Sequence, residues 1–199
     1  MTFAGLATFA SIFLVSSMLL TWGVLNYLRR KAILDTPNHR SSHAVPTPRG
    51  GGLAITPLLI VLIAVVFAFT GVTSIGPWLM LAAAGGLGLL SWLDDRHDLP
   101  AAKRFALQFV AVMIGVLALD KPVLALFVPL PQFIGLGYVG LGILAIMIGF
   151  LIWNWHPAKL FLGDVGSVPL GFILGWLLLK IASEGAWAIA LILPSYYLF

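Results

Sequence analysis

Long apolar runs separated by short polar segments make up most of the chain. Each run approaches the roughly 20 residues that a helix rising about 1.5 Å per residue needs to cross about 30 Å of hydrocarbon. Such segments must be helical, because lipid cannot satisfy the backbone groups of an isolated strand. The pattern predicts an all-α, polytopic membrane helix bundle with about six or seven transmembrane helices in a single transmembrane domain, residues 1–199. The predicted helices occupy residues 4–28, 53–70, 76–93, 102–119, 133–153 and 168–182, and a seventh begins near Ala186.

The composition supports this class of protein. Hydrophobic residues make up 61% of the chain and charged residues 9%, with a mean hydropathy of +1.07, which is far from the values of a soluble domain. The first run is not expected to be a cleaved signal peptide, because it is too long, no basic residue precedes it, and Arg29, Arg30 and Lys31 follow it. The absence of cysteine excludes disulfides and thiolate metal sites.

Basic residues are divided very unequally between the two sides of the predicted bundle. If successive loops lie on alternate sides, Lys121 and Lys180 share one side, and the other side holds Arg29, Arg30, Lys31, Arg40, Arg49, Arg96, Lys103, Arg104 and Lys159. By the positive-inside rule the second side is cytoplasmic. We therefore expect an outside N-terminus and cytoplasmic loops near residues 29–52, 94–103 and 154–167. This topology explains the net charge of +4 and removes the reason to expect a nucleic-acid partner.

The ionisable residues gather on the same side. Alternation places all four histidines and every acidic residue except Asp120 and Glu184 there. Channels and transporters usually carry ionisable groups deep within their helices, and the predicted helix interiors are almost free of them. The sequence thus favours chemistry or binding at the cytoplasmic surface. A transporter or channel is the less favoured alternative, and ion flux abolished by Asp94→Asn would indicate it.

The first cytoplasmic loop, residues 35–52, is unusually rich in proline, glycine and polar side chains. Its prolines restrict the backbone, while three consecutive glycines at its end allow a close approach to a ligand or a helix. Arg40, Arg49, Ser41 and Ser42, with the amides that open the next helix, form a set that would hold a phosphate or diphosphate, and His43 is a further candidate contact. The loop lacks a Walker sequence. The alternative is an ordinary basic loop with proline turns.

Asp94 and Asp95 follow the third apolar run directly. Acidic residues at the hydrocarbon edge are costly unless a metal ion or basic side chains offset their charge, which indicates a functional site. The alternative is a solvated loop between two helices. Lys103 is expected to extend to the interface, whereas Arg104 and Gln108, four residues apart on one helix face, are placed to line a site.

Asp164 lies in Gly-Asp-Val-Gly-Ser, just before the sixth apolar run. Three carboxylates on one side, with several arginines, suit a Mg²⁺ ion that bridges an anionic diphosphate. A plain helix cap at Asp164 is the alternative. The histidines lack the paired spacing of a zinc helix, so no zinc site is expected.

Three motifs in this order carry a resemblance to a known family. They are Asp35-x-Pro-Asn-x-Arg-Ser-Ser-His-x-x-Pro-Thr-Pro-Arg-Gly-Gly-Gly52, Asp94-Asp95, and Asn154-x-x-Pro-Ala-x-x-Phe-x-Gly-Asp164-x-Gly-Ser167. The chain resembles, over essentially its whole length, the polyprenyl-phosphate N-acetylhexosamine-1-phosphate transferases of glycosyltransferase family 4. The branch that initiates O-antigen and related surface glycans is the most similar, and the enzyme that starts the peptidoglycan lipid is more distant.

The resemblance implies a Mg²⁺-dependent enzyme of cell wall or lipopolysaccharide biosynthesis. Such an enzyme transfers a sugar 1-phosphate from a UDP-N-acetylhexosamine to undecaprenyl phosphate at the cytoplasmic face of the bacterial inner membrane and releases UMP. It implies catalytic roles for Asp94 and Asp95 and a metal-binding role for Asp164. The implied substrate-binding residues are Asn38, Arg40, Ser42, His43, Arg49, Asn154 and Lys159. A homodimer is possible, and the particular hexosamine and glycan stay open.

The sequence also departs from the family pattern. Members carry a cytoplasmic loop of the form Asn-x-x-Asn-Phe-x-Asp-Gly-x-Asp-Gly, whereas residues 137–150 here run directly into Trp153-Asn154. The family's last, histidine-containing loop is also missing before Phe199. We expect a shortened member in which two membrane crossings are absent, so that Asp164 keeps its side of the membrane. Activity is expected to be impaired or lost, which makes a non-catalytic protein that binds polyprenyl phosphate or UDP-sugar the alternative function.

Overall fold

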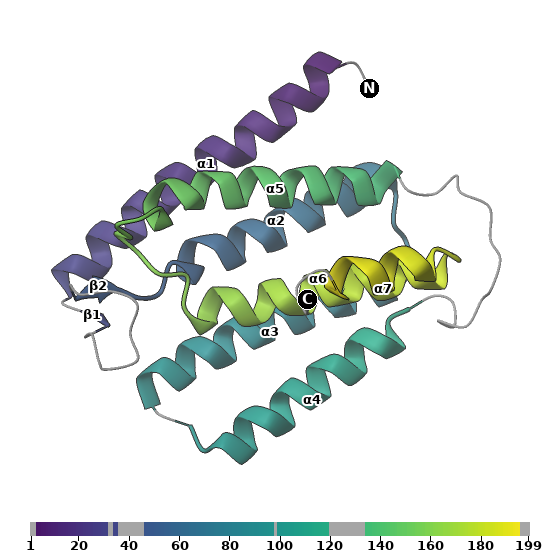
Figure 1. The fold of residues 1–199 in the computed structure, drawn as a ribbon. Helices are drawn as coiled ribbons and strands as arrows, with labels where there is room; N and C mark the ends of the chain where they lie inside the picture. Colours follow the sequence, from purple (N-terminus) through teal and green to yellow (C-terminus); the bar gives the residue numbers. More distant parts are fainter. Residues whose placement is uncertain (1–2, 32–33, 36–45, 98, 120–133, 196–199) are drawn as a thin grey trace.

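The computed structural model describes residues 3–31, 34–35, 46–97, 99–119 and 134–195. Within this part the chain forms an antiparallel pair of two-residue strands and a bundle of helices (Figure 1). The elements are α1 (Phe3–Arg30), β1 (Leu34–Asp35), β2 (Thr47–Pro48), α2 (Gly52–Thr70), α3 (Ile75–His97), α4 (Ala101–Leu117), α5 (Ile134–Asn154), α6 (Asp164–Ser183) and α7 (Trp187–Ser195). The predicted all-α, polytopic membrane architecture is confirmed.

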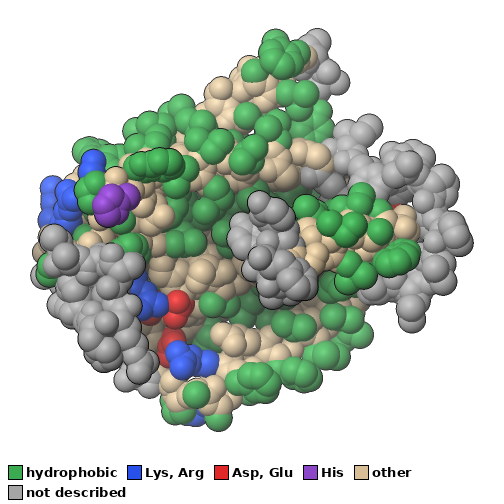
Figure 2. Space-filling model, in the orientation of Figure 1, with side chains coloured by type: hydrophobic (Ala, Val, Ile, Leu, Met, Phe, Trp, Pro, Cys, Tyr) green, Lys and Arg blue, Asp and Glu red, His purple; other side chains and the backbone are tan. Residues whose placement is uncertain are grey.

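Five of these helices are long and apolar enough to cross a membrane. They are α1, α2, α3, α6 and, from Gly137, α5. α4 has 17 residues and α7 has nine, so both are shorter than these five. Apolar side chains are spread over much of the described surface in Figure 2, as expected for helices that face lipid.

Helix α2 lies at the centre of the bundle. Its side chains Ile55, Leu59, Leu62 and Ile63 are fully buried, and it packs against α1, α3, α5 and α6. α1 packs along α5, where the hydroxyl of Ser17 donates a 2.7 Å hydrogen bond to the carbonyl of Ile146. α4 packs chiefly on α3, and α7 folds back along α6 (Figure 1). A rigid central helix therefore connects the elements that carry the polar residues.

Two helices extend beyond the apolar runs that predicted them. α3 continues to His97, so Asp94 and Asp95 lie in its last turns, and α6 begins at Asp164, four residues before the sixth run. The helical backbone satisfies its own hydrogen bonds whatever the side chains are, so polar residues at a membrane edge can prolong a helix. The carboxylates of Asp94, Asp95 and Asp164 are consequently all held on helices.

Candidate functional site

The site begins with a backbone junction between the first and last polar segments. The backbone of Arg49 forms a parallel β-bridge with the backbone of Phe161. The amides of Gly50 and Gly51 donate to the carbonyl of Phe161 at 3.1 and 2.9 Å, and the amide of Phe161 donates to the carbonyl of Pro48 at 2.9 Å. These bonds fix the start of α2 beside the start of α6.

Glycine makes the approach of these two helices possible. A Cβ on Gly52 would collide with the backbone of Gly166, and the amide of Gly52 donates a 2.8 Å hydrogen bond to the carbonyl of Leu162. Backbone atoms cannot move aside as a flexible side chain can, so only glycine permits this contact. The close approach brings Arg49, which precedes α2, next to Asp164, the first residue of α6.

Arg49 and Asp164 form an ion pair across this junction. Nη2 of Arg49 lies 2.8 Å from Oδ1 of Asp164, and both side chains are about half exposed, at 44% and 45%. The residue at the cap position of α6 is Gly163, and no side chain of the described residues caps that helix end by a hydrogen bond. The Asp164 carboxylate is thus bound to an arginine.

Asp94 and Arg104 form a second ion pair between α3 and α4. Nη1 of Arg104 lies 2.8 Å from Oδ2 of Asp94, and the amide of Leu99 donates to Oδ1 of Asp94 at 2.9 Å. The Asp94 side chain is only 11% exposed. A carboxylate with both oxygens bound and little exposure is held in a fixed position, unlike the solvated loop that was the alternative.

Asp95 lies close enough to the two pairs for their charges to act on it. It is attracted by Arg49 and repelled by Asp164 and Asp94. Within the described part of the chain, no hydrogen bond or ion pair engages its carboxylate. Figure 2 shows acidic and basic side chains gathered at one end of a largely apolar surface. The arrangement therefore combines three carboxylates with two arginines.

A cavity of about 250 Å³ opens beside these side chains. Its lining consists of Leu90, Ser91, Asp94, Ala101, Arg104, Phe105, Gln108, Asp164 and Val168. Arg104 and Gln108 share it, as their helical spacing predicted. Ser91 and Phe105 were not predicted, although Ser91 precedes Asp94 by three residues and so lies on the same face of α3.

The other predicted site residues that the structure describes are not among those that line the charged cavity. Asn154 donates from Nδ2 to the carbonyl of Leu160 at 3.0 Å, which closes the segment between α5 and α6. Lys159 places Nζ 5.9 Å from the centre of the Trp153 ring. Neither lines the 250 Å³ cavity. Asn38, Arg40, Ser42 and His43 lie outside the described residues.

The three carboxylates do not form a complete metal site by themselves. Among the described residues, no three acidic, histidine or cysteine side chains are arranged to hold a metal ion alone. Mg²⁺ in proteins commonly uses one or two carboxylates and takes its other ligands from phosphates and water. Asp95, together with the second oxygen of Asp164, fits that limited role.

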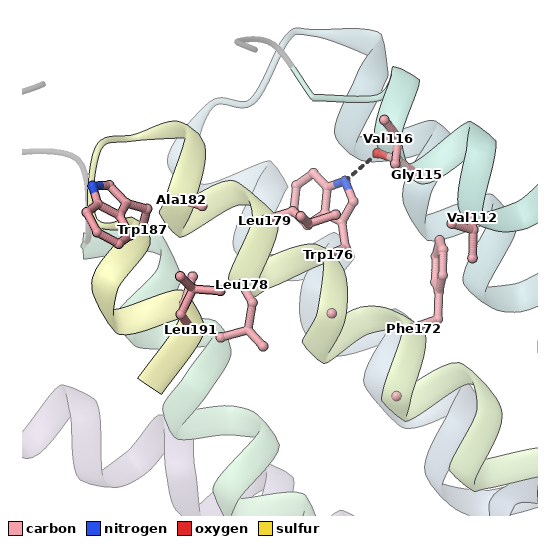
Figure 3. Close-up of a pocket in the computed structure, with 13 residues that line it drawn as sticks. Val112, Gly115, Val116, Phe172, Trp176, Leu178, Leu179, Ala182, Trp187 and Leu191 are labelled. Carbon is pink, nitrogen blue, oxygen red and sulfur yellow. Dashed lines mark hydrogen bonds between the residues drawn. The ribbon is translucent and has the colours of Figure 1, made fainter. Parts of the chain in front are cut away.

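A larger, apolar cavity of about 820 Å³ lies between α4, α6 and α7 (Figure 3). Phe172, Trp176 and Leu179 project into it from α6, and Trp176 donates from Nε1 to the carbonyl of Gly115 at 3.0 Å. Among the described residues, no ionisable side chain lines this cavity. The charged side chains therefore lie at the smaller cavity and not at this one.

Comparisons with known proteins agree with the fold and the motifs. A model of the family described as glycosyl transferase family 4 matches residues 123–182. A phospho-N-acetylmuramoyl-pentapeptide-transferase of a Nitratiruptor species is 32% identical over 108 residues, which cover 53% of this chain and 29% of that protein. A probable undecaprenyl-phosphate N-acetylglucosaminyl 1-phosphate transferase of Bacillus subtilis is 27% identical, over 81% of this chain and 59% of that protein.

The fold and these matches define a polytopic membrane protein with a charged site at one end of its helix bundle. Within that class, the chain is similar to glycosyl transferase family 4, whose model matches residues 123–182. It spans between about a third and three fifths of the length of these two relatives. The alignment with the Bacillus subtilis protein extends over 218 positions, more than the 199 residues of the whole chain. The predicted internal shortening is thereby confirmed.

Proposed function

We propose that the chain transfers a sugar 1-phosphate from a UDP-N-acetylhexosamine to undecaprenyl phosphate and releases UMP. The observation that carries the proposal is the convergence of Asp94, Asp95, Asp164, Arg49 and Arg104 at one end of the bundle, with a 250 Å³ cavity beside them. The names of the relatives, one of which includes undecaprenyl phosphate, support the same class of substrate. The product would initiate a bacterial surface glycan, of which O-antigen is the candidate.

The reaction exchanges one phosphorus–oxygen bond for another. An oxygen of the acceptor phosphate bonds to the phosphorus of the sugar phosphate, and the bond from that phosphorus to the UMP oxygen breaks with its electron pair. A phosphate monoester with a second pKa of about 6 is largely ionised at neutral pH, so the acceptor needs no strong base. The work left to the protein is positioning and charge neutralisation.

The two ion pairs suit that work. Arg49 and Arg104 would offer planar donors to phosphate oxygens when substrate enters, since a guanidinium binds phosphate and carboxylate in the same way. Asp94 and Asp95 would orient the acceptor phosphate, and Asn154 and Lys159 remain proposed contacts to substrate. Asn38, Arg40, Ser42 and His43 are proposed to complete the diphosphate site.

Mg²⁺ is the proposed cofactor. Asp164, with Asp95 beside it, would hold the ion, which supplies neutralisation of the phosphate charge when bound. Arg49 would then hold the Asp164 carboxylate in a fixed orientation beside the cavity. We place the site on the cytoplasmic side of the inner membrane, because the residues at this end of the bundle include most of the basic ones.

A second candidate is a shortened family member that binds polyprenyl phosphate or UDP-sugar without turnover. The observation that favours it is the internal segment of the Bacillus subtilis relative that has no counterpart here. The family motif absent from this sequence would supply further carboxylates near the nucleotide. Losing one such electrostatic contact lowers a rate by about 10²–10³.

UMP release by the detergent-solubilised chain tests the proposal. The assay contains Mg²⁺, undecaprenyl phosphate and a panel of UDP-N-acetylhexosamines, with Asp164→Asn as the inactive variant and Lys103→Gln as the matched control. Release that disappears only in Asp164→Asn supports the transferase and names its sugar. Mg²⁺-dependent binding of UDP-sugar without release favours the second candidate, and neither release nor binding contradicts both.

A further inference from the structure

Helix α6 carries a proline in its second turn, at position 169. Proline has no N–H, so the residue that would donate to the carbonyl of Val165 within the helix cannot do so. A buried carbonyl without a donor is costly, and the structure supplies one from another helix. The hydroxyl of Thr56 on α2 donates to the carbonyl of Val165 at 2.6 Å.

Thr56 is enclosed at the point where three helices meet. The residue is 5% exposed. A Cβ on Gly88 of α3 would lie 2.8 Å from Cγ2 of Thr56 and 3.4 Å from Cγ of Pro169. The methyl group of Thr56 therefore packs against α3, while its hydroxyl binds α6. Asp94 and Asp95 on α3 and Asp164 on α6 lie within two turns of this crossing, and Arg49 precedes α2.

We propose that Thr56 is a positioning residue whose hydroxyl replaces the hydrogen bond that Pro169 removes and so holds the first turn of α6, with Asp164, against α2. The inference rests on the proposed function for its catalytic consequence. Val165 follows Asp164 directly, so a displaced Val165 carbonyl also displaces the carboxylate that Arg49 binds. Thr56 itself is buried and is not among the residues that line the cavity.

The two groups of the side chain can be separated by substitution. Thr56→Val keeps the shape and removes the hydroxyl, whereas Thr56→Ser keeps the hydroxyl and removes the methyl group. Thr70→Val is the matched control, because the hydroxyl of Thr70 donates to the carbonyl of Val66 within the other end of α2. Wild type and the three variants are compared by amide hydrogen exchange of residues 163–172 and by steady-state kinetics of UMP release.

Loss of the hydroxyl is expected to open the first turn of α6. In Thr56→Val, exchange in residues 163–172 should become about tenfold faster, as for the loss of one buried hydrogen bond. The kcat should fall by about tenfold with KM values unchanged, because Thr56 positions the Asp164 carboxylate that is proposed to act on charge developing in the transition state. Thr56→Ser and Thr70→Val should resemble the wild type. Unchanged exchange in Thr56→Val, or equal effects in Thr56→Ser, would overturn the proposal.

A second substitution tests the role of Pro169. Pro169→Ala restores an N–H that can donate to the carbonyl of Val165, so adding Thr56→Val to it should change exchange by less than about twofold. A full tenfold effect in that background would overturn the inference. If the wild-type chain shows no turnover, the proposed function fails, and the exchange data still decide whether Thr56 holds this turn.

Discussion

The guanidinium of Arg49 lies 2.8 Å from the carboxylate of Asp164, although 115 residues separate them in the chain. Both side chains are about half exposed, so the pair should contribute only about 0–1 kcal/mol to stability after solvent screening. We predict that Arg49→Gln leaves thermal unfolding in detergent nearly unchanged and lowers UMP release by about 10²–10³. A large loss of stability with full activity of the folded fraction would show that the pair is structural.

Arg104 and its neighbour Lys103 provide a matched pair of cations. Arg104 binds Asp94 and lines the charged cavity, whereas Lys103 is exposed and lies outside the cavity lining. Arg104→Gln should reduce turnover by about 10², and Lys103→Gln should stay within about twofold of the wild type. Equal effects of the two substitutions would mean that net charge near the membrane, and not the contact with Asp94, supports activity.

Gly52 is predicted to tolerate no side chain. Gly52→Ala places a methyl group against the backbone of Gly166 and should cost at least about 1–3 kcal/mol as the helices separate. Gly86→Ala is the control, since a Cβ there meets nothing within 4 Å and a helix interior gains about 0.5–1 kcal/mol from alanine. Thermal unfolding measures both, and a Gly52→Ala variant as stable as the wild type would contradict the close crossing of α2 and α6.

The absence of cysteine permits a direct test of orientation. Lys103→Cys marks the end of the bundle that holds the charged site, and Thr73→Cys marks the turn between α2 and α3 at the other end. A membrane-impermeant maleimide should label Thr73→Cys on intact cells and Lys103→Cys only after the inner membrane is opened. The reverse labelling pattern would place the site outside the cytoplasm.

The helices and the polar end of the bundle could be predicted from the sequence, but the pairing of side chains could not. Apolar length identifies a membrane helix, and charge asymmetry groups Arg49, Asp94 and Asp164 on one side. Which arginine binds which carboxylate depends on how closely α2 approaches α6, and that distance follows from the meeting of Gly52 and Gly166. No spacing within the sequence reports such a long-range contact.

The pattern of apolar residues also did not predict where the helices begin and end. Asp94 and Asp164 were assigned to polar segments between helices, yet both lie within helices because the backbone bonds continue past the last apolar residue. The bond from Thr56 to Val165 could not be anticipated either. This hydrogen bond forms because Pro169 removes a backbone N–H donor at a point where α2 packs against α6.

The most direct test of the charged site follows the phosphorus atom itself. The purified chain is given undecaprenyl phosphate, Mg²⁺ and a UDP-N-acetylhexosamine labelled at the β-phosphorus, and the lipid extract is counted beside that of Asp164→Asn and of a sample treated with a chelator. We expect label in the lipid only when Asp164 is unmodified and Mg²⁺ is free. Label that stays entirely in water-soluble products, with the wild-type chain folded, would contradict a transferase.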